Sequence, residues 1–309
     1  MKKVFIDGKA GTTGLRIAER LAARDDLQII SIPDELRKDY NARKQMINEA
    51  DIVFLCLPDA AAVEAVGMVE NENTVIIDAS TAHRTSDEWA YGLPELGEEF
   101  ETKIKQSKRI AVPGCHASGF IALVYPLIKN GIIGKDSLIC AHSITGYSGG
   151  GKGMIAEYES CSKDELLCAP RQYGISQQHK HLPEMKKITG LKNEPIFCPI
   201  VSDFYSGMEV TVPIFKKQLL KGGIEDIKNI YRELYNTPMI SFNEGNDEAG
   251  FISANKYKNK DSMSIEVYGN DDRILLVARY DNLGKGASGA AVECLNIKLG
   301  CDKTKNLEI

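Results

Sequence analysis

The sequence lacks the marks of membrane and secreted proteins. No stretch of its 309 residues is long and apolar enough to span a bilayer. The N-terminus passes from Met1-Lys2-Lys3 directly into the short apolar run Val4–Asp7, which is too brief for the core of a signal peptide. We therefore expect a cytoplasmic protein without a membrane partner.

An excess of positive charge is also absent. The chain has 38 Lys and Arg residues against 43 Asp and Glu residues, which gives a formal net charge of -5 at pH 7. A nucleic-acid-binding surface or a basic membrane patch normally needs the opposite balance. We therefore expect no nucleic-acid partner.

Paired cysteines are missing as well. None of the eight cysteines has CxxC spacing; they stand at positions 56, 115, 140, 161, 168, 198, 294 and 301. A cytosolic chain of this length does not need a disulfide framework. Most of these cysteines are expected to be small buried hydrophobic residues.

The first 113 residues alternate short apolar runs with stretches of helical periodicity. The run Asp51–Leu57 (DIVFLCL) is almost wholly apolar, which is typical of a strand covered on both faces. Such alternation predicts a Rossmann-type, doubly wound parallel sheet. The expected strands here are Val4–Asp7, Leu27–Ile32, Asp51–Leu57, Thr74–Asp78 and Arg109–Val112, with helices over Thr13–Ala23 and Ala60–Val69.

The pattern changes near residue 114. A helix is expected after Cys115, and fewer helices separate the β-like runs that follow. This predicts an α+β part with a mixed or antiparallel sheet. The expected strands here are Ser137–Ile144, Ile196–Asp203, Met208–Phe215, Ser262–Val267 and Ile274–Tyr280, followed by a C-terminal helix over Gly286–Leu299.

A glycine-rich loop, GKAGTTG (8–14), follows the first expected strand directly. Gly8, Gly11 and Gly14 would permit a tight turn and the close approach of a pyrophosphate, and the next helix would offer its N–H groups. Thr12 and Thr13 add hydroxyl donors. Three glycines can also mark a plain turn, but the strand–loop–helix context favours a dinucleotide site.

The end of the second expected strand bears on which dinucleotide binds. It carries Ser31 rather than the Asp or Glu that is typical of NAD sites, and Arg37 and Lys38 follow within reach of a 2′-phosphate. Asp34 and Glu35 lie close by and oppose this interpretation. Arg37 and Lys38 also suit a solvated turn. On balance the pattern favours NADP(H).

Cys115 stands in the segment VPGCHAS (112–118), which ends an expected strand and opens an expected helix. A thiol at a helix N-terminus lies at the positive end of the helix dipole, which lowers its pKa. Backbone N–H groups at such a position can also stabilise an oxyanion. Although a buried structural cysteine is the alternative, this position favours a nucleophile.

Two histidines stand close together in the segment QHKHLPE (178–184). His181 has Glu184 three residues on, so the two can meet on one helical turn that has Pro183 near its start. The carboxylate would orient the imidazole and raise its pKa, which suits an acid/base partner for a thiol. His179 is the alternative partner.

The remaining histidines and a possible metal site carry less weight. An H-x-H pair can ligate a metal, but no third and fourth ligands are grouped with it, so we expect no metal site. His83, His116 and His142 stand alone in the sequence, and no chemistry is assigned to them.

Seven segments in order along the chain carry a family resemblance. They are GKAGTTGLRI (8–17), DASTAHR (78–84), YGLPEL (91–96), VPGCHASGF (112–120), GYSGGGKG (146–153), YGISQQHKHLPEM (173–185) and NLGKGASGAAVE (282–293). Together they resemble the N-acetyl-γ-glutamyl-phosphate reductases of arginine biosynthesis, in the shorter, type 2 subfamily. The segment 78–84 departs from the DLSADFR of the longer subfamily, which leaves the roles of Thr81 and His83 open.

The resemblance implies two domains and several cofactor contacts. An NADP-binding Rossmann domain would comprise residues 1–113 and about 284–309, with the C-terminal helix packed back onto it, and residues 114–283 would form a catalytic and dimerisation domain. Asn282 and Gly286 would lie near the nicotinamide and Ser80 near the cofactor. Ser148 and Gly149 would lie near the substrate or cofactor.

The resemblance also implies a reaction. Cys115 would attack an acyl phosphate to form a thioester, which NADPH would reduce to an aldehyde, with His181 as the acid/base group. Arg84, Lys152 and Arg171 are candidates for binding the substrate's carboxylate or phosphate, although exposed Arg and Lys are often merely solvated. A homodimer or homotetramer is expected.

Other functions remain open. The homologous reductase of lysine biosynthesis acts on N-acetyl-aminoadipyl phosphate, and the extra methylene of that substrate is worth only about 1–3 kcal/mol in a pocket. A cysteine hydrolase would need no nucleotide loop. A non-catalytic, NADP-binding redox sensor would need neither His181 nor Glu184.

Overall fold

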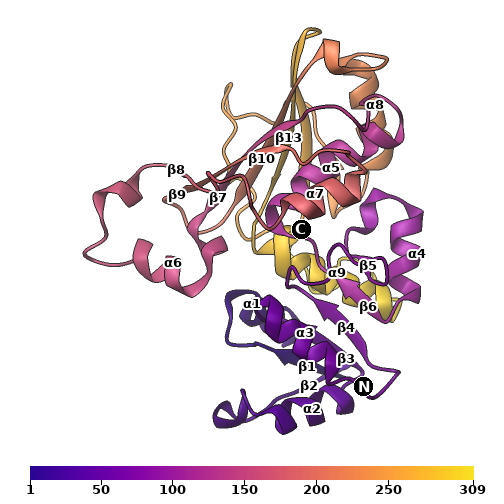
Figure 1. Ribbon diagram of the computed structural model, residues 1–309, viewed down its shortest axis with the longest axis vertical. Helices are drawn as coiled ribbons and strands as arrows, with labels where there is room; N and C mark the ends of the chain where they lie inside the picture. Colours follow the sequence, from indigo (N-terminus) through magenta and orange to yellow (C-terminus); the bar gives the residue numbers. More distant parts are fainter. The chain divides into compact units, whose positions relative to one another are not determined.

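The structure is a computed structural model that describes residues 1–309. The chain divides into two compact units (Figure 1). The first unit comprises Met1–Pro113 and Ala287–Leu307, and the second comprises Gly114–Gly286 and Glu308–Ile309. No helix has both the length and the apolar character needed to cross a membrane.

The first unit contains a six-stranded parallel sheet with strand order β2-β1-β3-β4-β6-β5. Its strands are β1 (Lys2–Asp7), β2 (Leu27–Ile30), β3 (Ile52–Leu55), β4 (Val75–Asp78), β5 (Ala90–Tyr91) and β6 (Arg109–Ala111). Its helices are α1 (Thr12–Leu21), α2 (Tyr40–Glu49), α3 (Asp59–Gly67), α4 (Glu98–Gln106) and α9 (Gly289–Leu299). This architecture confirms the predicted doubly wound sheet.

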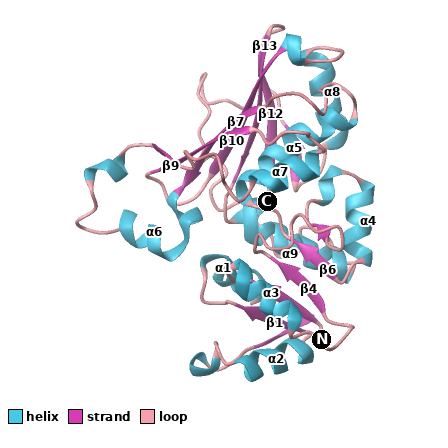
Figure 2. Cartoon of the chain, in the orientation of Figure 1, coloured by secondary structure: helices cyan, strands magenta, loops and turns pink.

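Helices cover both faces of this sheet, as its apolar strands require. Val4 and Ile6 belong to a core shared with α1, α4 and α9, whereas Phe5 points to the opposite core, shared with α2 and α3. Figure 2 shows β1 and β4 among these helices, and β3 lies between these two strands in the strand order. The C-terminal helix starts later than predicted, because Gly284–Ser288 forms a π-helical turn before it.

The second unit contains a seven-stranded mixed sheet with strand order β11-β12-β13-β10-β7-β9-β8. Its strands are β7 (Cys140–Gly146), β8 (Arg171–Gln172), β9 (Ile196–Ser202), β10 (Met208–Phe215), β11 (Ile240–Phe242), β12 (Met263–Gly269) and β13 (Arg273–Tyr280). Its helices are α5 (Cys115–Lys129), α6 (Gly151–Tyr158), α7 (Leu182–Thr189) and α8 (Ile224–Leu234). The prediction of a mixed or antiparallel sheet is confirmed.

The helix α5 lies at the centre of this unit. It packs on β10 and β13 and contacts α7 and α8 (Figure 1). Residues 116–124 are all buried, because the helix has the sheet on one side and other helices beside it. Alternate strand residues face it: Val210 and Val212 are fully buried, whereas Phe215 at the end of β10 is 62% exposed. The sheet and the neighbouring helices therefore fix the position of the first turn of α5.

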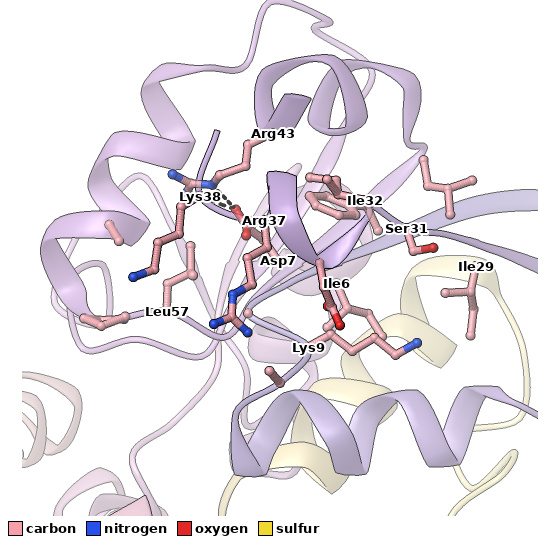
Figure 3. Close-up of a pocket in the computed structure, with 17 residues that line it drawn as sticks. Ile6, Asp7, Lys9, Ile29, Ser31, Ile32, Arg37, Lys38, Arg43 and Leu57 are labelled. Carbon is pink, nitrogen blue, oxygen red and sulfur yellow. Dashed lines mark hydrogen bonds and ion pairs between the residues drawn. The ribbon is translucent and has the colours of Figure 1, made fainter. Parts of the chain in front are cut away.

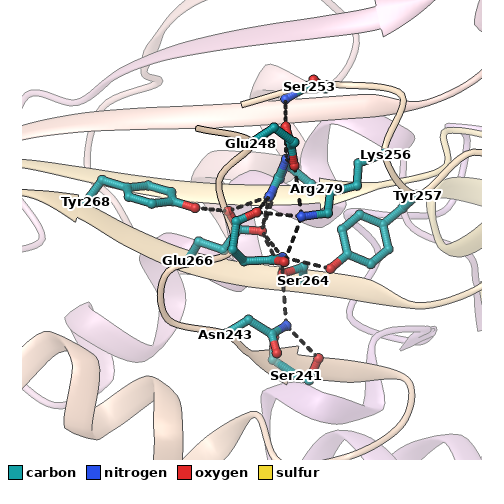
Figure 4. A network of polar contacts seen from close by, with 11 residues as sticks. Ser241, Asn243, Glu248, Ser253, Lys256, Tyr257, Ser264, Glu266, Tyr268 and Arg279 are labelled. Atoms are coloured by element: carbon teal, nitrogen blue, oxygen red, sulfur yellow. Dashed lines mark hydrogen bonds and ion pairs between the residues drawn. The ribbon is translucent and has the colours of Figure 1, made fainter. Parts of the chain in front are cut away.

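A buried ionic network fixes the segment 243–257 to strands β12 and β13 (Figure 4). The guanidinium of Arg279 donates two hydrogen bonds of 3.0 Å to the Glu266 carboxylate, and neither side chain is exposed. Arg279 also donates to Glu248 at 2.8 Å and to the carbonyl of Asn246 at 2.6 Å. Lys256 completes the network through Glu248.

We predict that Arg279→Met lowers the free energy of unfolding by about 3–5 kcal/mol, because it leaves a buried carboxylate without its cation. Urea denaturation would measure the loss. The matched control is Arg232→Met, since Arg232 is half-exposed and pairs with the equally exposed Glu244; it should cost less than about 1 kcal/mol. Equal losses in the two variants would contradict the assigned role of the network.

Candidate active site

The glycine-rich loop lies at the carboxyl end of β1, in the first unit. Strand β1 has β2 on one side and β3 on the other, so the strand order reverses there, which is where doubly wound sheets bind ligands. Gly8 has φ +86°, and a Cβ added to it would lie 2.3 Å from the Cys56 carbonyl oxygen. A Cβ at Gly14 would lie 2.6 Å from the oxygen of Gly8. Both positions therefore require glycine.

The N-terminus of α1 follows this loop with its N–H groups available. Gly11 is the N-cap residue, and no side chain caps the helix. Thr12 and Thr13 form the first turn and are half-buried. The helix thus presents backbone donors and its positive dipole end next to the loop, an arrangement that suits a pyrophosphate.

A cavity of about 430 Å³ adjoins the loop (Figure 3). Gly8, Ser31 and Arg37, which the sequence singled out, all line it, and Lys38 does so as well. Two of the lining residues form an ion pair: Arg43 Nε donates to Asp7 Oδ2 at 3.0 Å. Burial is the main cause that raises the pKa of Asp7, and Arg43 opposes it.

Ser80 follows β4 and is fixed by a carboxylate at the end of that strand. Asp78 accepts hydrogen bonds from the Ser80 backbone N–H at 2.9 Å and from its hydroxyl at 2.7 Å. The same carboxylate lies 2.7 Å from His83 Nδ1, and the His83 ring stacks on Trp89 at 4.0 Å. His83, which stood alone in the sequence, is therefore part of this turn.

Arg84 is largely buried in the first unit. Its Nε donates to the Val112 carbonyl at 2.8 Å, and one Nη donates to the Ala79 carbonyl at 2.9 Å. These bonds join the segment after β4 to the segment after β6. The Arg84 guanidinium therefore stabilises these two backbone segments. A contact between Arg84 and the substrate stays a prediction.

In the second unit, Cys115 is the first residue of α5, and its backbone is held from two directions. The N–H of the N-cap residue Gly114 donates to Glu184 Oε1 at 2.9 Å. The hydroxyl of Tyr280 donates to the Cys115 carbonyl at 2.5 Å and accepts the N–H of Gly119 at 3.1 Å. The side chain of Cys115 is half-buried.

Three histidines cluster near the start of α5. The His116 ring lies 5.7 Å from His179 and 5.6 Å from His181, and the last two rings lie 4.8 Å apart. His116 Nδ1 lies 2.6 Å from Ser143 Oγ, and its Nε2 lies 2.7 Å from the Tyr173 hydroxyl. The view of His116 as an isolated histidine is therefore wrong, because the fold brings β7 and the 173–181 segment to it.

Burial sets the charge of two of these rings. It lowers the pKa of His116 to about 3 and that of His179 to about 4, and nearby positive charge adds to both shifts. Both imidazoles are therefore neutral near pH 7. His179 Nδ1 accepts the backbone N–H of His181 at 3.2 Å, so the neutral ring carries its proton on Nε2.

His181 and Glu184 lie at the N-terminus of α7, with Pro183 in its first turn as predicted. Both side chains are almost completely buried. The Glu184 carboxylate reaches the N-cap residue of α5, so it links the two helices that carry Cys115 and His181. Its predicted role in orienting the His181 ring stays a prediction.

Four more residues that the family resemblance singled out gather in the second unit. Asn282 Nδ2 donates to Ser148 Oγ at 3.0 Å, and a Cβ on Gly149 would lie 3.4 Å from the same Nδ2. A Cβ on Gly286 would lie 3.1 Å from the Cβ of Cys115. The backbone of Gly286 therefore packs directly on the candidate nucleophile.

Lys152 and Arg171 lie on more exposed elements. Lys152 is in α6 and Arg171 is in β8, and both side chains are exposed. Arg171 lines a second cavity, of about 420 Å³, together with Lys163 and Asp164. The structure thus leaves both cations accessible without linking either to Cys115.

Comparison with known proteins shows the family. Residues 33–104 match the semialdehyde dehydrogenase NAD binding domain, and residues 115–282 match the semialdehyde dehydrogenase dimerisation domain. An N-acetyl-gamma-glutamyl-phosphate reductase of Chelativorans sp. (strain BNC1) is 42% identical over 307 residues, covering 96% of this chain and 98% of the relative. One from Trichormus variabilis is 40% identical, with 96% and 97% coverage.

The chain belongs to the N-acetyl-γ-glutamyl-phosphate reductase family. This confirms the resemblance drawn from the seven segments. The matched domains also establish a nicotinamide-dinucleotide-binding domain and a dimerisation domain, which indicates a homo-oligomer.

Solved structures of aspartate semialdehyde dehydrogenases share the fold. The enzyme II of Vibrio cholerae is 16% identical with a TM-score of 0.73, covering 97% of this chain and 99% of that one. The Candida albicans enzyme, solved with NADP, is 16% identical with a TM-score of 0.65, covering 96% and 98%.

Sequence reasoning missed three residues that shape the site of this reductase family member. Tyr280 and Tyr173 contact the start of α5, and Asp281 accepts the N–H groups of Leu283 and Gly284 at 2.7 and 2.9 Å. Tyr173 opens the segment YGISQQHKHLPEM, which was a usable signal. Tyr280 is the last residue of β13 and Asp281 follows it, so both resemble ordinary strand-end residues and nothing in the sequence marked them.

We predict that Gly286→Ala lowers reductase turnover about tenfold, because the added methyl group presses on Cys115 and displaces its thiol. Steady-state kinetics would measure kcat, and a melting curve would confirm the fold. The control is Gly67→Ala at the end of α3, where an added Cβ meets no atom within 4 Å. Unchanged turnover of Gly286→Ala would contradict the close packing.

Proposed function

We propose that this protein catalyses the NADPH-dependent reduction of N-acetyl-γ-glutamyl phosphate to N-acetylglutamate 5-semialdehyde and phosphate, a step of arginine biosynthesis. The observation that carries the proposal is the position of Cys115 at the start of α5, where hydrogen bonds hold its backbone and the buried His116 imidazole follows it in the chain. We infer the identity of the substrate from the names of the relatives, which are N-acetyl-gamma-glutamyl-phosphate reductases. The glycine loop supplies a cofactor site in the same chain.

NADP(H) is the cofactor that we propose for the first unit. The loop leaves no room for a Cβ at Gly8, and the cavity beside it is lined by Ser31, Arg37 and Lys38. These are donors and cations that suit a ribose 2′-phosphate. Asp34 also lines the cavity and weakens the preference, but the cations outnumber it. When bound, the reduced nicotinamide supplies a hydride.

Cys115 forms the covalent intermediate in this mechanism. Its thiolate attacks the acyl carbon, a C–S bond forms, and the C–O bond breaks as phosphate leaves with the electron pair. The positive end of α5 favours the thiolate, and backbone N–H groups there stabilise the oxyanion. After hydride addition the tetrahedral adduct collapses, and the C–S bond breaks to release the aldehyde and the Cys115 thiolate.

His181 is the proton-transfer group that we propose. It takes the thiol proton of Cys115 before the attack, and that proton passes to the departing phosphate oxygen. His179 is less suited, because its pKa of about 4 makes it a weak base and its Nδ1 already accepts a backbone N–H. Glu184 acts as a positioning residue through Gly114.

We further propose that exposed cations bind the substrate's carboxylate and phosphate. Lys152 and Arg171 are accessible, whereas Arg84 already uses two of its N–H groups on backbone carbonyls. Arg84 is therefore the weakest of the three candidates. The assembly that we propose is a homodimer or homotetramer formed through the dimerisation domain.

An assay in the reverse direction tests the proposed function. With N-acetylglutamate semialdehyde, NADP and phosphate, we expect NADPH absorbance to appear only when all three are present. Parallel reactions would contain the semialdehyde that is one methylene longer, or aspartate semialdehyde. Preference for the longer compound would assign the protein to the lysine pathway, and silence with every aldehyde would contradict a reductase.

We predict that Cys115→Ser lowers this activity by roughly a thousandfold or more, because a nucleophile is removed. NADPH affinity, measured by fluorescence titration, should not change. The control is Cys161→Ser, an exposed cysteine that should leave both quantities unaltered. Substantial activity in Cys115→Ser would refute the thioester route.

We predict that NADPH binds more tightly than NADH, and that Arg37→Ala weakens NADPH binding by about ten- to hundredfold through the loss of a charge-assisted contact. NADH, which has no 2′-phosphate, should bind the variant as it binds the original protein. Calorimetry would give both affinities. Tighter binding of NADH by the unmodified protein would overturn the assignment of NADP(H).

A further inference from the structure

A second group of cysteine and histidine side chains lies on the opposite face of the sheet from the histidine cluster. Cys140 and His142 are two residues apart on β7, so they point to the same face. Cys198 on β9 stands directly opposite His142 in the parallel register. The residues between them, Ala141 and Phe197, are buried toward the helices.

These three side chains already lie close together. Their ligand atoms are all within 4.8 Å of one another, and Cys140 Sγ is 4.0 Å from His142 Nε2. Zinc bonds of about 2.3 Å to sulfur and about 2.0 Å to nitrogen would need the atoms to approach only slightly further. Cys140 and Cys198 are half-buried and His142 is exposed, so an ion can reach them.

We infer that Cys140, His142 and Cys198 form a binding site for one zinc ion. Two thiolates and one imidazole are ligands that Zn²⁺ prefers, whereas Ca²⁺ and Mg²⁺ require oxygen. Water fills the fourth position of the tetrahedron. Each thiol loses its proton when the metal binds.

A disulfide between the two cysteines fits the geometry less well. Cys140 stands opposite Ile196 and not opposite Cys198, so the two cysteines are diagonal neighbours on adjacent strands. Both cysteines are free thiols in the structure. A metal ion can bind both sulfur atoms without a covalent bond between them.

The position of the site gives it a structural consequence. A bound ion would join β7 to β9, and these strands carry Ser143 and Phe197 on their helix-covered face. Ser143 hydrogen bonds to His116, and the Phe197 ring lies 5.2 Å from the His116 ring. The zinc site would therefore brace the strands that support the histidine cluster. Spacing along the chain did not reveal it, because Cys198 lies on a separate strand.

Metal titration of the full chain tests the site. Cys115→Ser is the background, so that the thiol beside the histidine cluster cannot take the metal. With Co²⁺ as an optical probe we expect thiolate-to-metal absorption that saturates at one ion per chain, and Zn²⁺ should displace it. Adding Cys140→Ser, His142→Gln or Cys198→Ser should weaken binding at least tenfold.

Exposed Cys168→Ser is the matched control and should leave the titration unchanged. Circular dichroism would confirm that each variant folds. The inference would be overturned if no metal bound, or if the Cys140→Ser, His142→Gln and Cys198→Ser variants bound metal as tightly as the Cys168→Ser control. A Cys140–Cys198 disulfide that mass spectrometry finds in the protein purified under reducing conditions would also overturn it. Reductase activity is not read in this experiment, so its result is independent of the proposed function.

Discussion

The backbone position of Cys115 is the constraint on which the site depends. The Cys115 carbonyl accepts a hydrogen bond from the Tyr280 hydroxyl, and the N–H of Gly114 donates to Glu184. Strand β13 and helix α7 therefore both hold the first turn of α5. Gly286 adds a backbone surface against the same residue. Because Cys115 is already ordered in this way, its reaction with an acyl group loses less conformational entropy on the way to the transition state.

Much of the fold could be predicted because burial leaves a clear pattern. The apolar run of β3 and the alternation of Met208–Phe215 were found from the sequence. The helices α2 and α4 were missed because they are mostly polar: α4 has a single buried residue, Ile104. Short edge strands such as β8, with two exposed residues, give no periodic signal at all.

The site was predictable in part, for a different reason. Motif chemistry identified Cys115 and the His179–His181 pair, because each stands in an unusual local segment. His116 and the Cys140–Cys198 group could not be recognised, because their partners come from other strands. Likewise, Arg279 resembled any strand residue until the fold placed Glu266 beside it. Contacts between distant segments are what the sequence does not display.

The most direct test of the central claim is to trap the acyl group on Cys115. The protein would be mixed with N-acetyl-γ-glutamyl phosphate without NADPH, quenched in acid and examined by intact-mass and peptide mass spectrometry. The account predicts one N-acetylglutamyl group per chain, attached to the peptide that contains Cys115 and lost on adding NADPH before the quench. No mass increase, or an acyl group on a different residue, would contradict it.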